Sequence, residues 1–300
     1  MSRRLLITTS NGCYCLDEGR DEVRLIQEKI PGFWFFKKGG LGFFGIAYYQ
    51  PENKVLFASR ESLGTKKVGR KATDTKIYTW DPRTETSEIM AQVLDIHDIH
   101  QICTHKELLF LTDTGKNRVV VYNLVSKQRV RHINIGEIRK DIHHINTLTV
   151  IGTKLLVGLN NRGKEFAQIL TLDLEQVLQE DKFEFFTNDK AQIHTLEGLY
   201  HTHDAQIWGD RELLVCSSFD GKVFKTNPLK ELIHAGDWAR GLCPDGDKLW
   251  VGASPIAERR ERHREDLDGY VKLFSGFPFR LEKSVLLKGC GQVNDLLLID

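Results

Sequence analysis

The sequence repeats one strand pattern about every fifty residues, and this repeat limits the possible folds more than any other feature. In one copy, an apolar strand follows His203-Asp204-Ala205, a turn follows at Gly209-Asp210, and a second apolar strand follows at Leu213-Leu214-Val215. The residues that open the corresponding strands are Phe44, His97, Asn146, His203, Arg240 and Asn294. They are 53, 49, 57, 37 and 54 residues apart. A strand-rich unit that recurs at this interval is typical of a β-propeller.

We therefore predict an all-β fold, a six-bladed β-propeller that occupies residues 1–300 as a single domain, because closed β folds reach this length as one domain. Three strands between residues 5 and 30 lack a fourth, and Val293 to Ile299 supplies it. Pairing the two ends of the chain in one blade closes the ring and removes two open sheet edges. The other blades are predicted at about 42–90, 95–135, 142–190, 199–235 and 237–288, with a short helix between Leu174 and Asp181.

Composition and charge exclude few classes of protein but favour a soluble one. Hydrophobic residues make up 41% and charged residues 28%, and the net charge of +1 gives no general reason to expect nucleic acid or a membrane as partner. Only three apolar residues, Leu5-Leu6-Ile7, follow the first basic residues, which is too few for the core of a signal peptide. No run of apolar residues is long enough for a membrane helix. We expect a cytoplasmic protein whose six cysteines are reduced.

The residues that open the innermost strands should meet at one mouth of the central channel. Residues two positions earlier should point to the same side of these strands, because side chains alternate along a strand. They include Asp95, His144, His201 and Trp238. The turns between second and third strands return to this mouth, and they carry Arg60, Asp113, Asn161, Arg162 and Ser218. We therefore expect polar side chains from several blades to converge there.

Histidines dominate this predicted cluster. His97, His144 and His203 are candidate acids or bases and Arg240 a candidate anion ligand, because imidazole titrates near neutral pH and guanidinium binds carboxylates and phosphates. Candidate substrate-binding residues are Asn146, Asn294, Arg162, Trp238 and Arg60. One divalent metal ion could be held by His97, His144, His201 and His203, and imidazole ligands favour a transition metal over calcium. The alternative is that these side chains only fill the channel and hydrogen-bond neighbouring blades.

Positive charge points to an anionic small-molecule ligand. The loop Lys66–Lys71 and the run Arg259–Arg264 should overhang the same mouth as Arg240, although such runs are more often solvated surface. Residues 256–268 could form a short charged helix that acts as a lid. Gly39-Gly40-Leu41-Gly42 leads into a strand rather than a helix, so we expect no nucleotide cofactor. His100 and His105 flank the inner strand of the third blade and are expected outside the site.

Four inner-strand motifs carry a resemblance to a family of uncharacterised bacterial propeller proteins. Their order along the chain is Asp95-Ile96-His97-Asp98-Ile99, His144-Ile145-Asn146-Thr147-Leu148, His201-Thr202-His203-Asp204-Ala205 and Trp238-Ala239-Arg240-Gly241-Leu242. They resemble the family's His-Asp-Ile, His-x-Asn-x-Leu, Pro-His-Ser-Pro and Thr-Arg-Gly-Leu strands, but Asp204-Ala205 replaces Ser-Pro and Ala239 replaces Thr. The resemblance implies a six-bladed fold with its site at these strands, and it implies no reaction.

More distantly, the chain is similar to the gluconolactonase, paraoxonase and strictosidine-synthase superfamily of six-bladed propellers. That similarity implies a divalent cation held in the channel by Glu, Asn and Asp. Asn146 and Asn294 match such ligands in kind, but no channel Glu accompanies them, which argues against a calcium lactonase.

Two hypotheses of function follow. The first is a small-molecule enzyme of hydrolase, lyase or isomerase type that acts on a polar, anionic substrate at the channel mouth. The second is a ligand-binding or protein-interaction propeller without chemistry, since propellers serve both purposes.

Overall fold

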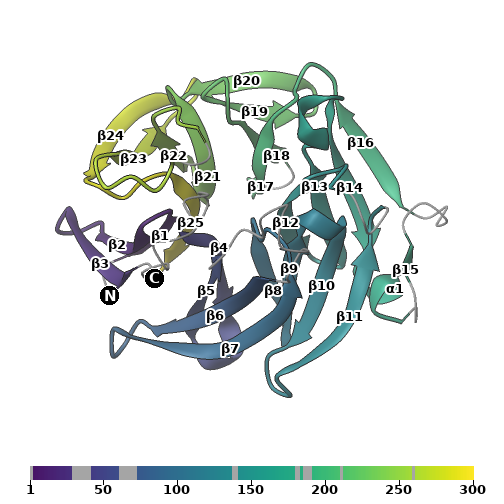
Figure 1. Cartoon of the computed structure of the whole chain (residues 1–300). Coiled ribbons are helices and arrows are strands. Elements are labelled where there is room, and N and C mark those ends of the chain that lie inside the picture. Colours follow the sequence, from purple (N-terminus) through teal and green to yellow (C-terminus); the bar gives the residue numbers. More distant parts are fainter. Residues whose placement is uncertain are drawn as a thin grey trace.

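The computed structural model describes residues 3–28, 42–60, 73–136, 141–179, 183–184, 191–209, 212–258 and 261–300. Six sheets stand around a central axis in the order of the chain, as Figure 1 shows, so the predicted six-bladed β-propeller is confirmed. The first blade joins the two ends of the chain. It consists of β25 (Val293–Ile299), β1 (Arg4–Thr9), β2 (Gly12–Asp17) and β3 (Glu22–Glu28).

Blades two to six each run outward from the strand nearest the axis. Blade two contains β4 (Gly42–Tyr49), β5 (Lys54–Arg60), β6 (Thr73–Asp81) and β7 (Thr86–Ile96). Blade three contains β8 (Ile102–His105), β9 (Leu108–Asp113), β10 (Arg118–Asn123) and β11 (Gln128–Asn134). Blade four contains β12 (Ile145–Ile151), β13 (Lys154–Leu159), β14 (Ala167–Asp173) and β16 (Gln192–Leu196). Blade five contains β17 (Thr202–Trp208), β18 (Glu212–Ser217), β19 (Lys222–Thr226) and β20 (Leu229–His234). Blade six contains β21 (Trp238–Asp245), β22 (Lys248–Ser254), β23 (Gly269–Ser275) and β24 (Arg280–Leu287).

Ring closure follows from the antiparallel pairing of β1 with β25, in which Leu6 lies opposite Leu297. The short helix expected after β14 is α1 (Leu174–Gln179). The predicted limits of blade four, 142–190, were too narrow. Its outer strand β16 lies beyond residue 190, and β15 (Phe183–Glu184) instead adds a fifth strand to blade three by pairing in parallel with β11.

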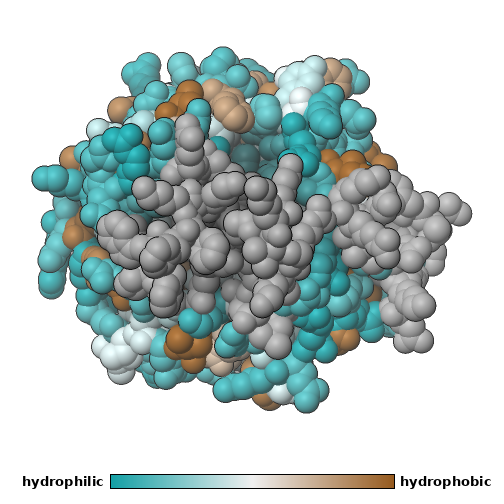
Figure 2. Space-filling model, in the orientation of Figure 1, coloured by the Kyte–Doolittle hydropathy of each residue, from teal (hydrophilic) through white to brown (hydrophobic). Residues whose placement is uncertain are grey.

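Six hydrophobic clusters hold the blades together, one between each pair of neighbours. Alternate residues of one strand enter different clusters: Leu6 packs against blade two with Phe43 and Trp80, whereas Leu5 and Ile7 pack against blade six. Both faces of a blade are therefore buried, which explains why the second strands of the blades, such as β9 and β13, contain continuous apolar runs. The six cysteines are free thiols. No helix in the described part of the chain is long and apolar enough to cross a membrane. Figure 2 shows a surface on which hydrophilic residues predominate and hydrophobic ones form small, separate patches.

Candidate functional site

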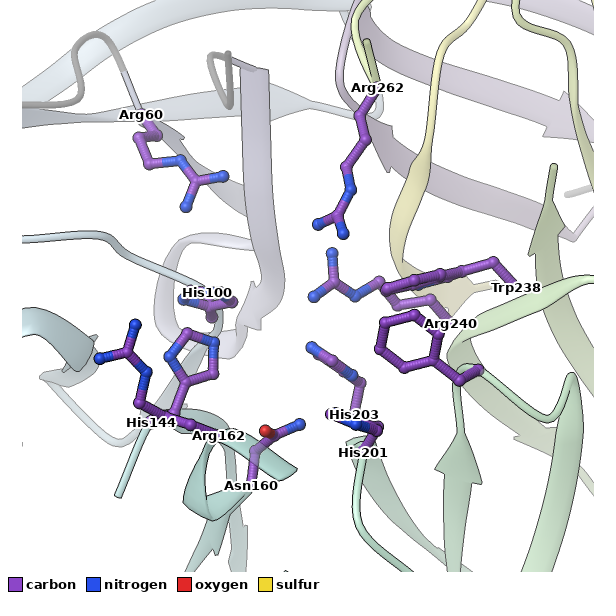
Figure 3. Close-up of a pocket in the computed structure, with 11 residues that line it drawn as sticks. Arg60, His100, His144, Asn160, Arg162, His201, His203, Trp238, Arg240 and Arg262 are labelled. Atoms are coloured by element: carbon purple, nitrogen blue, oxygen red, sulfur yellow. The ribbon is translucent and has the colours of Figure 1, made fainter. Parts of the chain in front are cut away.

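A cavity of about 220 Å³ opens at the mouth of the channel, and it is lined almost entirely by cationic, imidazole and aromatic side chains. Figure 3 shows them converging from opposite sides, with His100 and His144 facing His203 and Arg240. The lining residues are Arg60, His100, His144, Asn160, Arg162, His201, His203, Phe219, Trp238, Arg240 and Arg262. They come from blades two to six. Among the described residues, none that lines the cavity is a carboxylate.

His97 does not belong to this cavity, and His100 occupies the place that the repeat assigned to it. The sequence holds two consecutive His-x-Ile triads, His97-Asp98-Ile99 and His100-Gln101-Ile102. The second one leads directly into β8, which begins at Ile102. His97 instead lies beside an ion-paired cluster that joins blades two and three, with its Nε2 3.6 Å from Asp95 Oδ1 on β7. The register predicted for this blade was therefore wrong by three residues, and His100 was missed.

The ring of His100 is held in a defined orientation. Its Nδ1 lies 3.0 Å from the main-chain oxygen of Asp98 and 3.0 Å from Thr114 Oγ1. Thr114 donates its own hydroxyl proton to the main-chain oxygen of Ile145. Both neighbours of Nδ1 are thus acceptors, so His100 carries its proton on Nδ1. Burial lowers the pKa of His100 well below its usual value, and neighbouring His144, Arg60, Arg240 and His203 lower it further. His100 is therefore neutral at physiological pH.

His144 stands next to His100, with 4.9 Å between the ring centroids. Its Nδ1 lies 3.0 Å from Asp141 Oδ2, and this contact orients the ring. The main chain at His144 has a φ of +48°, a conformation that non-glycine residues rarely adopt. This local bend precedes β12 and places the ring over the cavity.

His203 and His201 line the opposite wall from blade five. His203 is buried, its Nδ1 lies 2.9 Å from Ser218 Oγ, and burial together with Arg240, His144 and Arg262 lowers its pKa well below the usual value. His201 packs edge-on against Phe219, with the ring centroids 4.4 Å apart. Burial lowers the pKa of His201 too, although Asp220 opposes this effect.

Two arginines on blades two and four are anchored by carboxylates. Arg60 ends β5, pairs with Asp98 and lies over the Phe44 ring, with 3.7 Å from the guanidinium carbon to the ring centroid. Arg162 follows β13 in a turn, is half exposed, and donates to the main-chain oxygen of Asp141 at 3.2 Å. Both residues were predicted to bind substrate, and both line the cavity.

Two arginines on blade six form the wall opposite them. The buried Arg240 donates from Nη1 to Asn294 Oδ1 at 3.1 Å and to Gln292 Oε1 at 3.5 Å. Arg262 donates from Nε to the main-chain oxygen of Ala257 and lies over the ring of Trp238, 4.5 Å from its centroid. Figure 3 shows the two guanidinium groups side by side. This wall can bind a carboxylate or phosphate through several N–H groups at once.

Asn146 and Asn294, predicted to orient a ligand, are used to connect blades and do not line the cavity. Asn146 donates to the main-chain oxygen of Thr202 at 2.6 Å, and Asn294 donates to that of Phe43 at 2.8 Å. Asn294 acts on the cavity only through its contact with Arg240. Asn160, which sequence reasoning overlooked, lines the cavity instead.

The donor set does not fit a bound metal ion. In the described part of the chain no group of three or more His, Cys, Asp or Glu side chains is placed to hold one. Of the four predicted ligands, His97 lies away from the others, and the Nδ1 atoms of His144 and His203 contact Asp141 and Ser218. Four guanidinium groups around the same space also disfavour a cation. The predicted metal ion therefore has no support among the described residues.

The loops predicted to overhang the mouth contribute one residue in the described structure. Arg262 comes from the run Arg259–Arg264, in which Arg259 and Arg260 lie outside the described residues, as does the loop Lys66–Lys71. Residues 261–268 form turns rather than the expected helix. The charge of that run was the only sequence signal for Arg262, and nothing in the pattern distinguished it from its neighbours.

Next to the cavity residues in the sequence, three buried side chains from three blades, Gln101, Asp204 and Asp295, form a hydrogen-bonded layer across the channel, here called the closed layer. Gln101 Nε2 donates to Asp204 at 3.0 Å and to Asp295 at 3.4 Å. Each of the three also accepts a main-chain N–H from the inner strand of the next blade, from Leu148 at 2.7 Å, Leu242 at 2.6 Å and Ile46 at 3.1 Å. Burial raises the pKa of both Asp204 and Asp295, and the Asp204 charge raises that of Asp295 further.

Solved structures resemble this chain in fold, although no family model and no curated protein matches its sequence. A chain of the nidogen/laminin complex matches with a TM-score of 0.67 at 12% identity, covering 99% of this chain and 98% of that one. A protein of unknown function from Bacteroides caccae matches with a TM-score of 0.65 at 10% identity, covering 100% and 99%. A candidate 6-phosphogluconolactonase from Bacteroides fragilis matches with a TM-score of 0.59 at 12% identity, covering 100% and 98%. At these identities the similarity shows the propeller fold alone.

Proposed function

We propose that this chain is an enzyme that binds a small anionic substrate in the cavity at the channel mouth and moves protons with the histidines that line it. The reaction would be of hydrolase, lyase or isomerase type. Arg240 and Arg262 would bind the negative charge, and His100, His144 and His203 would serve as acids or bases. His97 has no part in this proposal because it lies outside the cavity.

The observation that carries the proposal is the convergence of four guanidinium groups and four imidazoles on one cavity. Arg60 and Arg162 lie beside Asp98 and Asp141, but the buried Arg240 lies side by side with Arg262, and an anion between these two would offset their repulsion. A volume of about 220 Å³ suits a small molecule rather than a polymer. Imidazoles at such a site can accept and donate protons, and fixed guanidinium groups can stabilise the negative charge that develops during reaction.

The closed layer beneath the cavity favours the second candidate function, a propeller that binds its ligand without chemistry. Gln101, Asp204 and Asp295 show that buried polar residues in this channel can serve the fold alone. The similarity to a chain of the nidogen/laminin complex is compatible with such a role only at the level of the fold. The experiment must therefore separate binding from turnover.

The test begins with a thermal-shift screen of small carboxylates and phosphate esters, each paired with its neutral amide or alcohol. A ligand at about a hundred times its dissociation constant stabilises the protein by about 2.7 kcal/mol. We expect anions but not their neutral partners to raise the melting temperature. Arg240→Gln should abolish the shift, and the matched control Arg83→Gln, at an exposed arginine paired with Asp81, should keep it.

Each anion that binds is then incubated with the protein, and the mixture is analysed for products by NMR. Turnover that is lost in His144→Gln while binding persists supports an enzyme. Binding without turnover of any anion supports the second function. A screen in which no anion shifts the wild-type protein more than the Arg240→Gln variant contradicts both.

A further inference from the structure

We propose that His100 is the proton acceptor of this cavity and that it acquires this role when an anion occupies the site. The inference rests on the proposed anion-binding function and adds to it the identity of the base and the condition under which it acts. It concerns a histidine that the repeat pattern placed outside the site.

The hydrogen bonds of His100 leave only one nitrogen for chemistry. Nδ1 is committed to the main-chain oxygen of Asp98 and to Thr114 Oγ1, both at 3.0 Å. The lone pair is therefore on Nε2. Figure 3 shows the ring among the side chains that surround the cavity, next to His144. A neutral imidazole whose Nδ1–H is tied to a carbonyl can accept a proton at Nε2 and cannot donate one there.

The charges around His100 explain why an anion should control it. Arg60 on β5 and Arg240 on β21 face it, together with His144 before β12 and His203 on β17, while the carboxylate of Asp98 pairs with Arg60. Burial and these cationic neighbours disfavour the imidazolium form. An anion bound between the arginines offsets their field, and an opposite charge within about 4–6 Å changes a pKa by about 1–3 units.

His144 provides a contrast within the same cavity. Its Nδ1 faces the carboxylate of Asp141, whereas the Nδ1 of His100 faces a main-chain carbonyl. Two imidazoles 4.9 Å apart thus differ in the group behind them. One ring is thus oriented by a carboxylate and the other by a main-chain carbonyl, so the two imidazoles can take different roles in a proton transfer.

The chemical step is a proton transfer. The bond between the proton and the substrate, or a water held by it, breaks, and its electron pair stays on that oxygen or carbon. A new N–H bond forms at Nε2, and the positive charge at His100 is balanced by the bound anion. The proton then returns from Nε2 to product or solvent, so the protein ends unchanged.

The test uses the whole chain with ¹⁵N-labelled histidine and sulfate as the anion, because sulfate keeps its charge between about pH 5 and about pH 8. Chloride at equal ionic strength controls for screening. Without sulfate, the nitrogen shifts of His100 should show a neutral ring protonated at Nδ1. With sulfate, its apparent pKa should rise by about one unit or more. Calorimetry in buffers of different ionisation enthalpy should detect the accompanying proton uptake.

Two variants with the same substitution sharpen the test. His100→Asn keeps an N–H donor where Nδ1 stood and removes Nε2, so sulfate should still bind but proton uptake should disappear. His97→Asn, at the histidine outside the cavity, should behave like the wild type.

The outcomes separate this inference from the proposed function. If sulfate shifts the signals of His203 while His100 stays neutral, or if His100 carries its proton on Nε2, the cavity binds anions but the assignment of the base is overturned. If no histidine of the cavity responds to sulfate more than to chloride, the proposed function fails and this inference fails with it.

Discussion

The cavity and the closed layer beneath it use residues that are consecutive in the sequence, at or just before the start of the same inner strands, but the two layers use their polar groups differently. His100 is followed by Gln101, and His203 is followed by Asp204. Gln101 and Asp204 are saturated, because each accepts a main-chain N–H of the next blade and they bond to each other. The Nδ1 atoms of His100 and His203 form hydrogen bonds, to the main-chain oxygen of Asp98 and to Ser218 Oγ respectively, and both rings line the cavity. A buried polar residue in a propeller channel therefore indicates function only when part of its hydrogen-bonding capacity faces open space.

The closed layer also explains where the inner strands need glycine. Gln101, Asp204 and Asp295 come from alternate blades, and between them Gly45 and Gly241 occupy the corresponding positions. A side chain at Gly45 would meet the main chain of Gln101 at 2.8 Å, and one at Gly241 would meet that of Asp295 at 3.3 Å. Both glycines have positive φ, +78° and +83°. Neighbouring blades thus approach at backbone distance in this layer, whereas the cavity above remains open.

The largest expected effect is a difference in stability between a substitution in the closed layer and one in the cavity. Asp204→Ala leaves the buried N–H of Leu242 without its acceptor and leaves the amide of Gln101 with only its longer bond to Asp295, and an unsatisfied buried donor costs about 1–3 kcal/mol. We expect the free energy of unfolding in urea to fall by about 3 kcal/mol. His203→Ala, one residue earlier, should cost only about 1 kcal/mol, because the space it leaves joins the cavity. Equal losses for both variants would contradict the distinction between the layers.

The architecture could be predicted from the sequence, but the register of one blade could not. The repeating strand pattern and the three N-terminal strands that lacked a fourth were sufficient to predict six blades and closure by β25. His97 and His100 each begin a triad of the pattern His-x-Ile, so periodicity alone could not distinguish them. The difference comes from tertiary contacts: Thr114 and the main chain of Asp98 hold His100, while His97 lies beside Asp95.

The closed layer was not predicted because its hydrogen bonds join residues far apart in the sequence. Asp204 appeared only as a departure from a Ser-Pro motif, and the structure shows that it contacts Gln101 and Leu242, 103 and 38 residues away. Asn146 and Asn294 were assigned to a ligand by residue type, which cannot reveal that their amides donate to neighbouring strands. His144, His203, Arg60, Arg162 and Arg240 line the cavity as expected, because propeller topology alone places their positions at one mouth.

A second, intermediate effect should appear in the pH dependence of stability. Burial and the Asp204 charge raise the pKa of Asp295 well above its usual value. The folded protein therefore keeps a proton at pH values where the unfolded chain, with an Asp pKa of about 3.9, has lost it. The stability that this group contributes is complete below about pH 4 and is lost as the pH rises toward the folded pKa.

Asp295→Asn removes this titration. The free energy of unfolding of the wild type minus that of the variant, measured in urea from about pH 4.5 to about pH 8, should decrease by at most about 1.4 kcal/mol per pH unit. Asp266→Asn is the control, at an exposed carboxylate whose pKa is lowered by its hydrogen bond to Arg264. Its difference should stay nearly constant, because Asp266 is ionised in both states over this range. An Asp295 difference that grows with pH would contradict the raised pKa.

The smallest effect concerns one wall of the cavity. Gly163 lies in the turn after β13 with a φ of +67°, and a side chain there would meet the His201 ring at 2.2 Å. Gly246 has a φ of +60° with nothing within 4 Å of the same position. Alanine at either glycine strains the backbone by about 1 kcal/mol, so the two variants should lose similar stability. Only Gly163→Ala should displace His201. The NMR chemical shifts of the ¹⁵N-labelled His201 ring should therefore change in this variant and not in Gly246→Ala. The closed layer contacts neither glycine, so the pH dependence of stability that comes from Asp295 should be the same in both variants as in the wild type. A changed pH dependence would mean that the two layers are coupled.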